Sequence, residues 1–127
     1  GWGARLADVY QRSADVRLRG YSGYNTRWAL RVLPRVFPRN AVAPCLVTVF
    51  LGANDANCPP PLPGLPPSAS RQHVPLDEYV RNLRTAVSAA QSVGDSSARV
   101  LLITPPPVDD DGWRRHCCEL PSCLLLL

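Results

Sequence analysis

The chain has 127 residues, which is enough for one domain with a modest hydrophobic core. Apolar residues make up 46% of the chain, a proportion that fits a globular protein. The net charge of +4 comes from 14 Arg and no Lys, and these Arg residues are scattered along the chain. Because they form no dense basic cluster and no known module, we expect no nucleic-acid partner.

No apolar run approaches the roughly 20 residues of a membrane span, and the first residues do not resemble a signal peptide. We therefore expect a cytoplasmic location. The absence of Met predicts a chain that is processed, truncated or the product of an incomplete gene model. Five Cys occur, of which Cys117, Cys118 and Cys123 crowd near His116. A zinc site there is a minor alternative, because a paired C-x-x-C grouping is missing. Reduced thiols, no metal and no cofactor are expected.

The first two predicted elements are a helix and a short strand. Apolar residues from Trp2 to Ala14 recur at helical spacing, which predicts an amphipathic helix with Trp2 in the core. Residues 15–19 alternate polar and apolar, which favours a strand.

A turn with two glycines, residues 20–26, precedes a second helix over residues 26–37. Asn25 or Thr26 is a suitable N-cap for this helix. Pro34 should kink or shorten it, since proline lacks the N–H that the helix interior requires.

The stretch Cys45–Leu51 is apolar and rich in β-branched residues, which predicts a strand buried on both faces. Gly52, Asn54 and Asp55 follow at its carboxyl end, where open α/β sheets place ligands and chemistry. Gly52 permits a sharp turn and a close approach, and Asn54 offers an N–H₂ to a developing oxyanion. Asp55 is suited to accept backbone N–H groups and hold the turn. An ordinary exit from strand to loop is the alternative.

Residues 58–70 are rich in proline and predict an extended surface loop. A helix follows over 75–93, with acidic residues at its N-terminus and Gly94 as its stop. Its predicted apolar face consists of Leu76, Val80, Leu83, Val87 and Ala90. The next strand covers residues 100–103. The alternation of helices and strands predicts an α/β fold with parallel strands and helices on both faces.

Four short sequence motifs follow one another along the chain: residues 19–29 (RGYSGYNTRWA), 52–55 (GAND), 72–79 (QHVPLDEY) and 102–105 (LITP). Together they resemble the SGNH (GDSL-type) hydrolases. The resemblance covers residues 1–113, with residues 58–70 as a loop insertion. Residues 114–127 are expected to form a divergent C-terminal tail.

The resemblance implies hydrolysis of short-chain carboxylic esters by acyl transfer to a serine. Gly23 and Asn54 match the oxyanion-hole positions of the family, and Gly52 and Asp55 are expected to form the turn that supports Asn54. Such donors must point at the negative oxygen of the tetrahedral intermediate. The implied ligand is a small ester.

Two catalytic blocks of the family are expected to be missing. The nucleophile block, a Gly-Asp-Ser just after a first strand, is absent. The second block, an Asp-x-x-His pair that supplies the base and its orienting carboxylate, is also absent, because no His lies three residues after any Asp. Neither His73 nor His116 has the family's context, and Ser22 does not stand in a G-x-S-x-G motif. We therefore expect no catalytic residue in this chain and no activity from it alone.

The implied fold is an incomplete flavodoxin-like αβα sandwich, truncated at both ends and lacking its first strand. Cys45–Leu51 would then present an unpaired apolar edge, which invites pairing with another chain. The alternative function is a non-catalytic binding or regulatory fragment. It would self-associate or pair with a full-length esterase through this edge, or dock a partner through residues 58–70.

Overall fold

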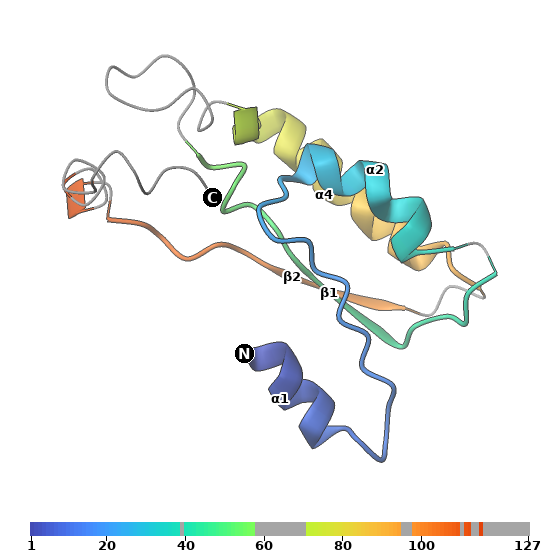
Figure 1. The fold of residues 1–127 in the computed structure, drawn as a ribbon. Coiled ribbons are helices and arrows are strands. Elements are labelled where there is room, and N and C mark those ends of the chain that lie inside the picture. The colour runs from blue at the N-terminus through green and yellow to red at the C-terminus, as the bar shows by residue number, and fades with distance from the viewer. Residues whose placement is uncertain (39, 58–70, 95–97, 110, 113–114, 116–127) are drawn as a thin grey trace.

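The computed structural model describes residues 1–38, 40–57, 71–94, 98–109, 111–112 and 115. In chain order the helices and strands are α1 (Trp2–Val9), α2 (Thr26–Val36), β1 (Leu46–Phe50), α4 (Leu76–Gln91) and β2 (Arg99–Ile103). Figure 1 shows α2 and α4 packed together on one side of the two strands, with α1 apart from them. The predicted α/β class is confirmed.

The two strands form a parallel sheet with α4 in the connection between them. Leu46 pairs with Arg99, and the register continues to Phe50 opposite Ile103. Parallel neighbours require a crossover connection, and a helix is its usual content. The predicted strands over Cys45–Leu51 and residues 100–103 and their parallel arrangement are confirmed. The carboxyl ends of β1 and β2 therefore lie at the same edge of the sheet.

Both ends of α2 are closed by side chains. Asn25 is its N-cap, because the Asn25 Oδ1 accepts the Trp28 backbone N–H at 2.8 Å. At the other end the Arg19 guanidinium donates to the Val36 carbonyl at 2.6 Å, which satisfies a carbonyl without a partner in the helix. Pro34 lies inside α2, and the helix ends two residues later.

The core around α4 differs from the predicted apolar face. Leu76 is 76% exposed, whereas Asn82, Ala86 and Ala90 are buried, so the prediction was wrong for the N-terminal half of this face. This buried stripe consists of small and polar side chains, and Asn82 at its start donates to the Thr26 hydroxyl of α2. The buried apolar residues are Val74, Ala86, Ala90, Val93 and Ala98.

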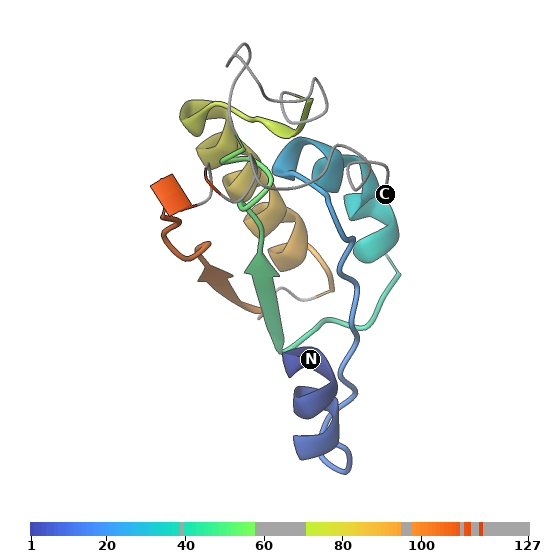
Figure 2. The same ribbon diagram turned by 60° about the vertical axis from the view of Figure 1, so that its left-hand side comes forward.

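The prediction for the N-terminal helix was wrong in length and in burial. α1 ends at Val9 instead of Ala14, and Trp2 is 54% exposed instead of being in the core. Figure 2 shows the reason, since α1 projects away from α2 and α4. Its nearest support is the following segment, where the Leu18 side chain lies against Gly3.

The predicted strand at residues 15–19 is also wrong, because this segment is neither helix nor strand in the structure. A strand requires a hydrogen-bonded neighbour, and within the described residues β1 pairs with β2 alone. The expectation of a strand buried on both faces fails for the same reason. Leu46 is 55% exposed and Phe50 is 47% exposed, since one face of β1 has no covering layer among the described residues.

Candidate active site

The candidate site begins at Gly52, where the chain leaves β1. Gly52 has a φ of +131°, a conformation that only glycine adopts readily. A Cβ at this position would lie 2.8 Å from the Tyr79 hydroxyl and 2.9 Å from Cγ of Pro105. The Tyr79 hydroxyl donates to the Leu51 carbonyl at 3.0 Å, and burial followed by the charge of Asp55 raises the Tyr79 pKa. Gly52 is therefore needed for its backbone angle and for its lack of a side chain.

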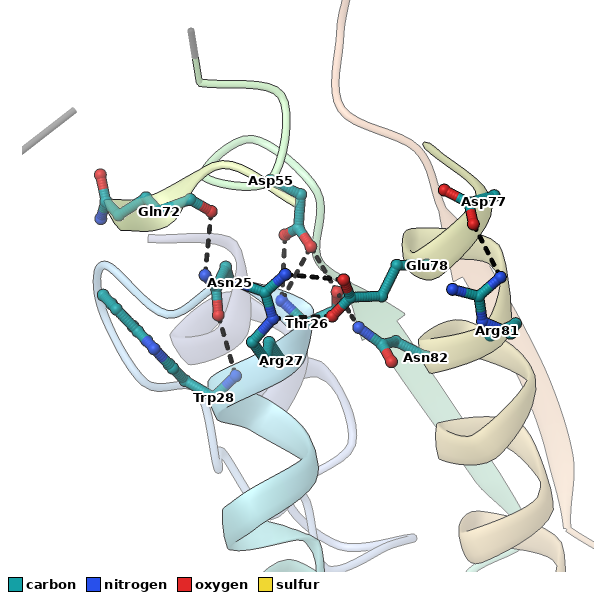
Figure 3. Close-up of polar contacts among 10 residues, drawn as sticks. All are labelled: Asn25, Thr26, Arg27, Trp28, Asp55, Gln72, Asp77, Glu78, Arg81 and Asn82. Carbon is teal, nitrogen blue, oxygen red and sulfur yellow. Dashed lines mark hydrogen bonds and ion pairs between the residues drawn. The ribbon is translucent and has the colours of Figure 1, made fainter. Parts of the chain in front are cut away.

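Asp55 joins this loop to both helices. Its carboxylate is 3% exposed and accepts the Thr26 backbone N–H at 3.0 Å and the Thr26 hydroxyl. Thr26 in turn accepts from Nδ2 of Asn82 on α4 at 3.0 Å, and the Asp55 carbonyl accepts the Val74 N–H at 3.1 Å. A carboxylate at the N-terminus of α2 is also favoured by the helix dipole. Figure 3 shows this cluster of Asp55, Thr26 and Asn82, which we call the Asp55 cluster.

A second set of contacts joins the two residues predicted to bind an oxyanion. Gly23 has a φ of +75°, and its carbonyl accepts the Gln72 Nε2 at 2.9 Å. The same Nε2 lies 3.2 Å from Oδ1 of Asn54, while Nδ2 of Asn54 donates to the Tyr24 carbonyl at 2.9 Å. Gly23 and Asn54 are 31 positions apart in the chain, and Gln72 contacts both.

Two N–H donors remain available at this place. An asparagine amide carries two N–H groups, and only one of those on Asn54 has a partner in the described part of the chain. The Gly23 backbone N–H likewise donates no hydrogen bond to any described residue, and Gly23 is exposed. The arrangement can therefore offer a backbone donor and a side-chain donor to an anionic oxygen.

An ion pair beside the Asp55 cluster connects the first turns of α2 and α4. Nε and Nη2 of Arg27 donate to the two carboxylate oxygens of Glu78 at 2.7 and 2.6 Å, a bidentate geometry (Figure 3). This contact lowers the pKa of Glu78 and raises that of Arg27. The ion pair fixes the relative position of the two helices whose first residues surround the site.

Comparison with known proteins identifies the family. The profile of the GDSL-like Lipase/Acylhydrolase family matches residues 1–119. The chain belongs to this family. It is 51% identical to a GDSL esterase/lipase of Arabidopsis thaliana over 91% of its own length and 47% of that protein. It is 45% identical to the isoamyl acetate-hydrolyzing esterase 1 homolog of Bos taurus over 94% of its own length and 46% of that protein. The chain spans slightly less than half of each of these GDSL relatives.

A nucleophile and a base of a GDSL hydrolase are not found together in the described residues. No Ser, Thr or Cys there hydrogen-bonds to a His, and Nδ1 of His73 instead lies 2.7 Å from the Asn57 carbonyl. Ser22 is exposed, and His116 lies outside the described residues. A Gly-Asp-Ser triplet does occur at residues 94–96, but it follows the helix α4 instead of a strand. It therefore does not match the family's nucleophile block.

Several contact residues of the site were not predicted from the sequence. Thr26 and Asn82 are polar residues within helices. From the sequence alone, Thr26 could equally be a helix cap and Asn82 could equally face solvent. Gln72 stands in the block that indicated the family, so its motif was a usable signal. The structure brings the predicted site residues together at the carboxyl end of β1, but the roles assigned to them remain predictions. These residues are Gly23, Gly52, Asn54 and Asp55.

The other predicted sites fall largely outside the described residues. Cys117, Cys118, Cys123 and the loop at residues 58–70 all do. Among the residues that are described, no group of three metal-ligating side chains gathers. No helix in that part of the chain is long and apolar enough to cross a membrane.

Proposed function

We propose that this chain supplies the oxyanion-binding part of a GDSL esterase that hydrolyses short-chain carboxylic esters through a serine nucleophile. The observation that carries the proposal is the pair of available donors, the Gly23 N–H and the second N–H of Asn54. The Bos taurus relative is named for hydrolysis of isoamyl acetate, a short-chain ester. Of the 121 aligned residues, which make up 46% of that protein, 45% are identical, and this supports a related substrate class.

The chemistry assigns one task to these donors. When a serine hydroxyl attacks an ester carbonyl, the carbonyl oxygen gains negative charge as the carbon becomes tetrahedral. Gly23 and Asn54 would donate to that oxygen more strongly than to the neutral carbonyl of the substrate, which lowers the barrier. The loss of one such donor typically costs about 10²–10³-fold in kcat.

The proposal also assigns the nucleophile and the base to segments other than these 127 residues. The chain contains no Asp-x-x-His pair, and its only Gly-Asp-Ser triplet follows a helix. We therefore expect the isolated chain to hydrolyse p-nitrophenyl acetate no faster than buffer does. Turnover that a serine-directed inhibitor abolishes would contradict this assignment.

A graft tests the positive part of the proposal. This chain replaces the homologous segment of the Bos taurus relative, and hydrolysis of isoamyl acetate is measured. We expect an active graft in which Asn54→Ala lowers kcat about 10²–10³-fold with little change in KM. Asn40→Ala is the matched control, since Asn40 is exposed and makes no side-chain hydrogen bond to a described residue. Equal activity of the two variants would refute the oxyanion role of Asn54.

A second candidate function is non-catalytic pairing with another chain. The exposed apolar residues of β1 and its single described neighbour favour it, because an open strand edge recruits other strands. The test is co-purification of this chain with the full-length relative, together with sedimentation of the chain alone. A complex or a homodimer would support pairing, and a monomer that binds no esterase would count against it.

A further inference from the structure

Gln72 makes an unusual number of contacts for a residue without an assigned role. Its Nε2 donates to the Gly23 carbonyl and to Oδ1 of Asn54, and its Oε1 accepts from Nδ2 of Asn57 at 3.1 Å. Its backbone carbonyl accepts from Nδ2 of Asn25 at 2.9 Å (Figure 3). One residue therefore contacts the two-glycine turn, the cap of α2 and the loop that follows β1.

We propose that Gln72 is a positioning residue that fixes the two oxyanion donors, an inference that rests on the function proposed above. The nitrogen and oxygen ends of a carboxamide have nearly the same shape, so packing alone does not decide which end faces the substrate. For Asn54 the hydrogen bonds decide it. An N–H of Gln72 faces its oxygen, and the Tyr24 carbonyl faces its nitrogen.

The orientation of Gln72 is itself determined by a neighbour. Nδ2 of Asn57 donates to its Oε1, which leaves Nε2 as the end that faces Asn54. The three amides form one directed series, Asn57 to Gln72 to Asn54, that ends on the Tyr24 carbonyl. Each link orients the next, and hydrogen bonds in such a series strengthen one another.

The contact with Gly23 has a separate effect. Glycine is the most flexible residue, and Gly23 has a positive φ in an exposed turn. The hydrogen bond from Gln72 to its carbonyl holds the peptide plane between Gly23 and Tyr24, which directly follows the plane that carries the Gly23 N–H, and so narrows the conformations open to the turn. Only a side chain with two N–H groups and an acceptor can make all three contacts. Glutamate lacks the donors, and alanine lacks both functions.

The experiment measures the exchange of the Asn54 side-chain amide protons by NMR on the ¹⁵N-labelled 127-residue chain. One net hydrogen bond corresponds to roughly a fivefold change in population, so we expect Gln72→Ala to accelerate this exchange about fivefold. Gln72→Glu should accelerate it at least as much, because a carboxylate attracts the N–H₂ end of Asn54 and favours a flipped amide. Gln91→Ala is the matched control, since Gln91 is exposed and makes no side-chain hydrogen bond to a described residue.

The backbone amides of Thr26 and Val74 report whether the fold is intact, since both donate to Asp55. Unchanged Asn54 exchange in both Gln72 variants would overturn the proposal. If Gln72→Ala also disturbs the two reporter amides, the nearly isosteric Gln72→Glu decides whether the effect on Asn54 is specific. Equal acceleration of Asn54, Thr26 and Val74 in that variant would show a merely structural role and also overturn the proposal.

Kinetics of the graft separate this proposal from the proposed function. We expect Gln72→Ala to lower kcat about fivefold with KM within twofold, in the same direction as Asn54→Ala. A loss of kcat in Asn54→Ala with none in Gln72→Ala would refute the role of Gln72 alone. No loss in either variant would refute the oxyanion site itself, and the role of Gln72 with it.

Discussion

The carboxyl end of β1 and the outer surfaces of the molecule are built in opposite ways. At the carboxyl end of β1 most of the buried side chains are polar: Asn25, Thr26 and Asp55 are at most 3% exposed. On the outer surfaces the large apolar side chains are exposed, as Trp2 of α1 and Leu101 of β2 illustrate at 54% and 51%. This is the reverse of the usual distribution, in which large apolar groups are inside.

The two regions differ in whether their side chains find partners within the described residues. In the polar region every buried side-chain donor and acceptor that the structure describes has a partner. The apolar surfaces of α1 and of the sheet have no layer of described residues packed over them. Hydrogen-bond geometry, more than a large core, therefore determines the shape of the candidate site.

The largest expected effect comes from removal of the Asp55 carboxylate. Asp55→Ala leaves the Thr26 N–H and hydroxyl buried without an acceptor, and we expect a loss of about 3 kcal/mol in the free energy of unfolding. Urea denaturation measures it. Asp15→Ala is the control, because Asp15 is in an exposed ion pair with Arg17 that should contribute under about 1 kcal/mol. Equal losses in the two variants would remove the contrast between the two regions.

A methyl group at Gly52 tests the same region through sterics. Gly52→Ala forces a strained backbone angle and brings Cβ against Tyr79 and Pro105, so we expect a loss of about 2 kcal/mol. Gly20→Ala is the control, since no atom lies within 4 Å of a Cβ placed there. The denaturation midpoint of Gly20→Ala should stay close to that of the parent chain. A neutral Gly52→Ala would show that the turn is not tightly packed.

The ion pair between Arg27 and Glu78 should give a smaller and pH-dependent effect. Because the folded state lowers the pKa of Glu78, its stabilising contribution is present above the ordinary value of 4.5 and disappears as the pH falls through the lowered pKa. Arg27→Met should therefore lower the urea midpoint at pH 7 and have progressively less effect below pH 4.5. A difference that persists undiminished in acid would indicate a packing effect of the Arg27 side chain instead.

The smallest effect on stability is expected on the exposed sheet. Leu101→Thr keeps a residue suited to a strand and removes apolar surface that is already in water, so we expect a change within about 0.5 kcal/mol. Sedimentation should show less self-association of this variant if the sheet recruits other chains. A loss comparable to that of Asp55→Ala would mean that this surface is buried in solution.

Much of the local structure is predictable from the sequence. The periods of α2, β1, α4 and β2 predicted elements whose bounds agree within a few residues. Residue type narrowed the cap of α2 to Asn25 or Thr26, and the structure has Asn25. These features depend on interactions between near neighbours in the chain. The four blocks at residues 19–29, 52–55, 72–79 and 102–105 together indicated the family through local patterns of the same kind.

What the sequence did not reveal depends on distant partners. Residues 15–19 have the alternation of a strand, but a strand forms only beside another strand. Trp2 has the spacing of a core residue, yet its burial requires a surface to pack on. Asn82 and Gln72 are ordinary polar residues until α2 and the loop after β1 are brought next to them. Contacts between segments that are far apart in the chain cannot be predicted from the pattern of one segment alone.

Hydrogen exchange of the backbone amides tests the contrast between the two regions most directly. We expect the Thr26 and Val74 amides, which donate to Asp55, to be among the slowest to exchange in the chain. We expect fast exchange throughout α1 and across residues 15–19. Uniform protection over α1, the sheet and the Asp55 cluster would refute the contrast, because the fold would then be held by its apolar surfaces as much as by its buried polar contacts.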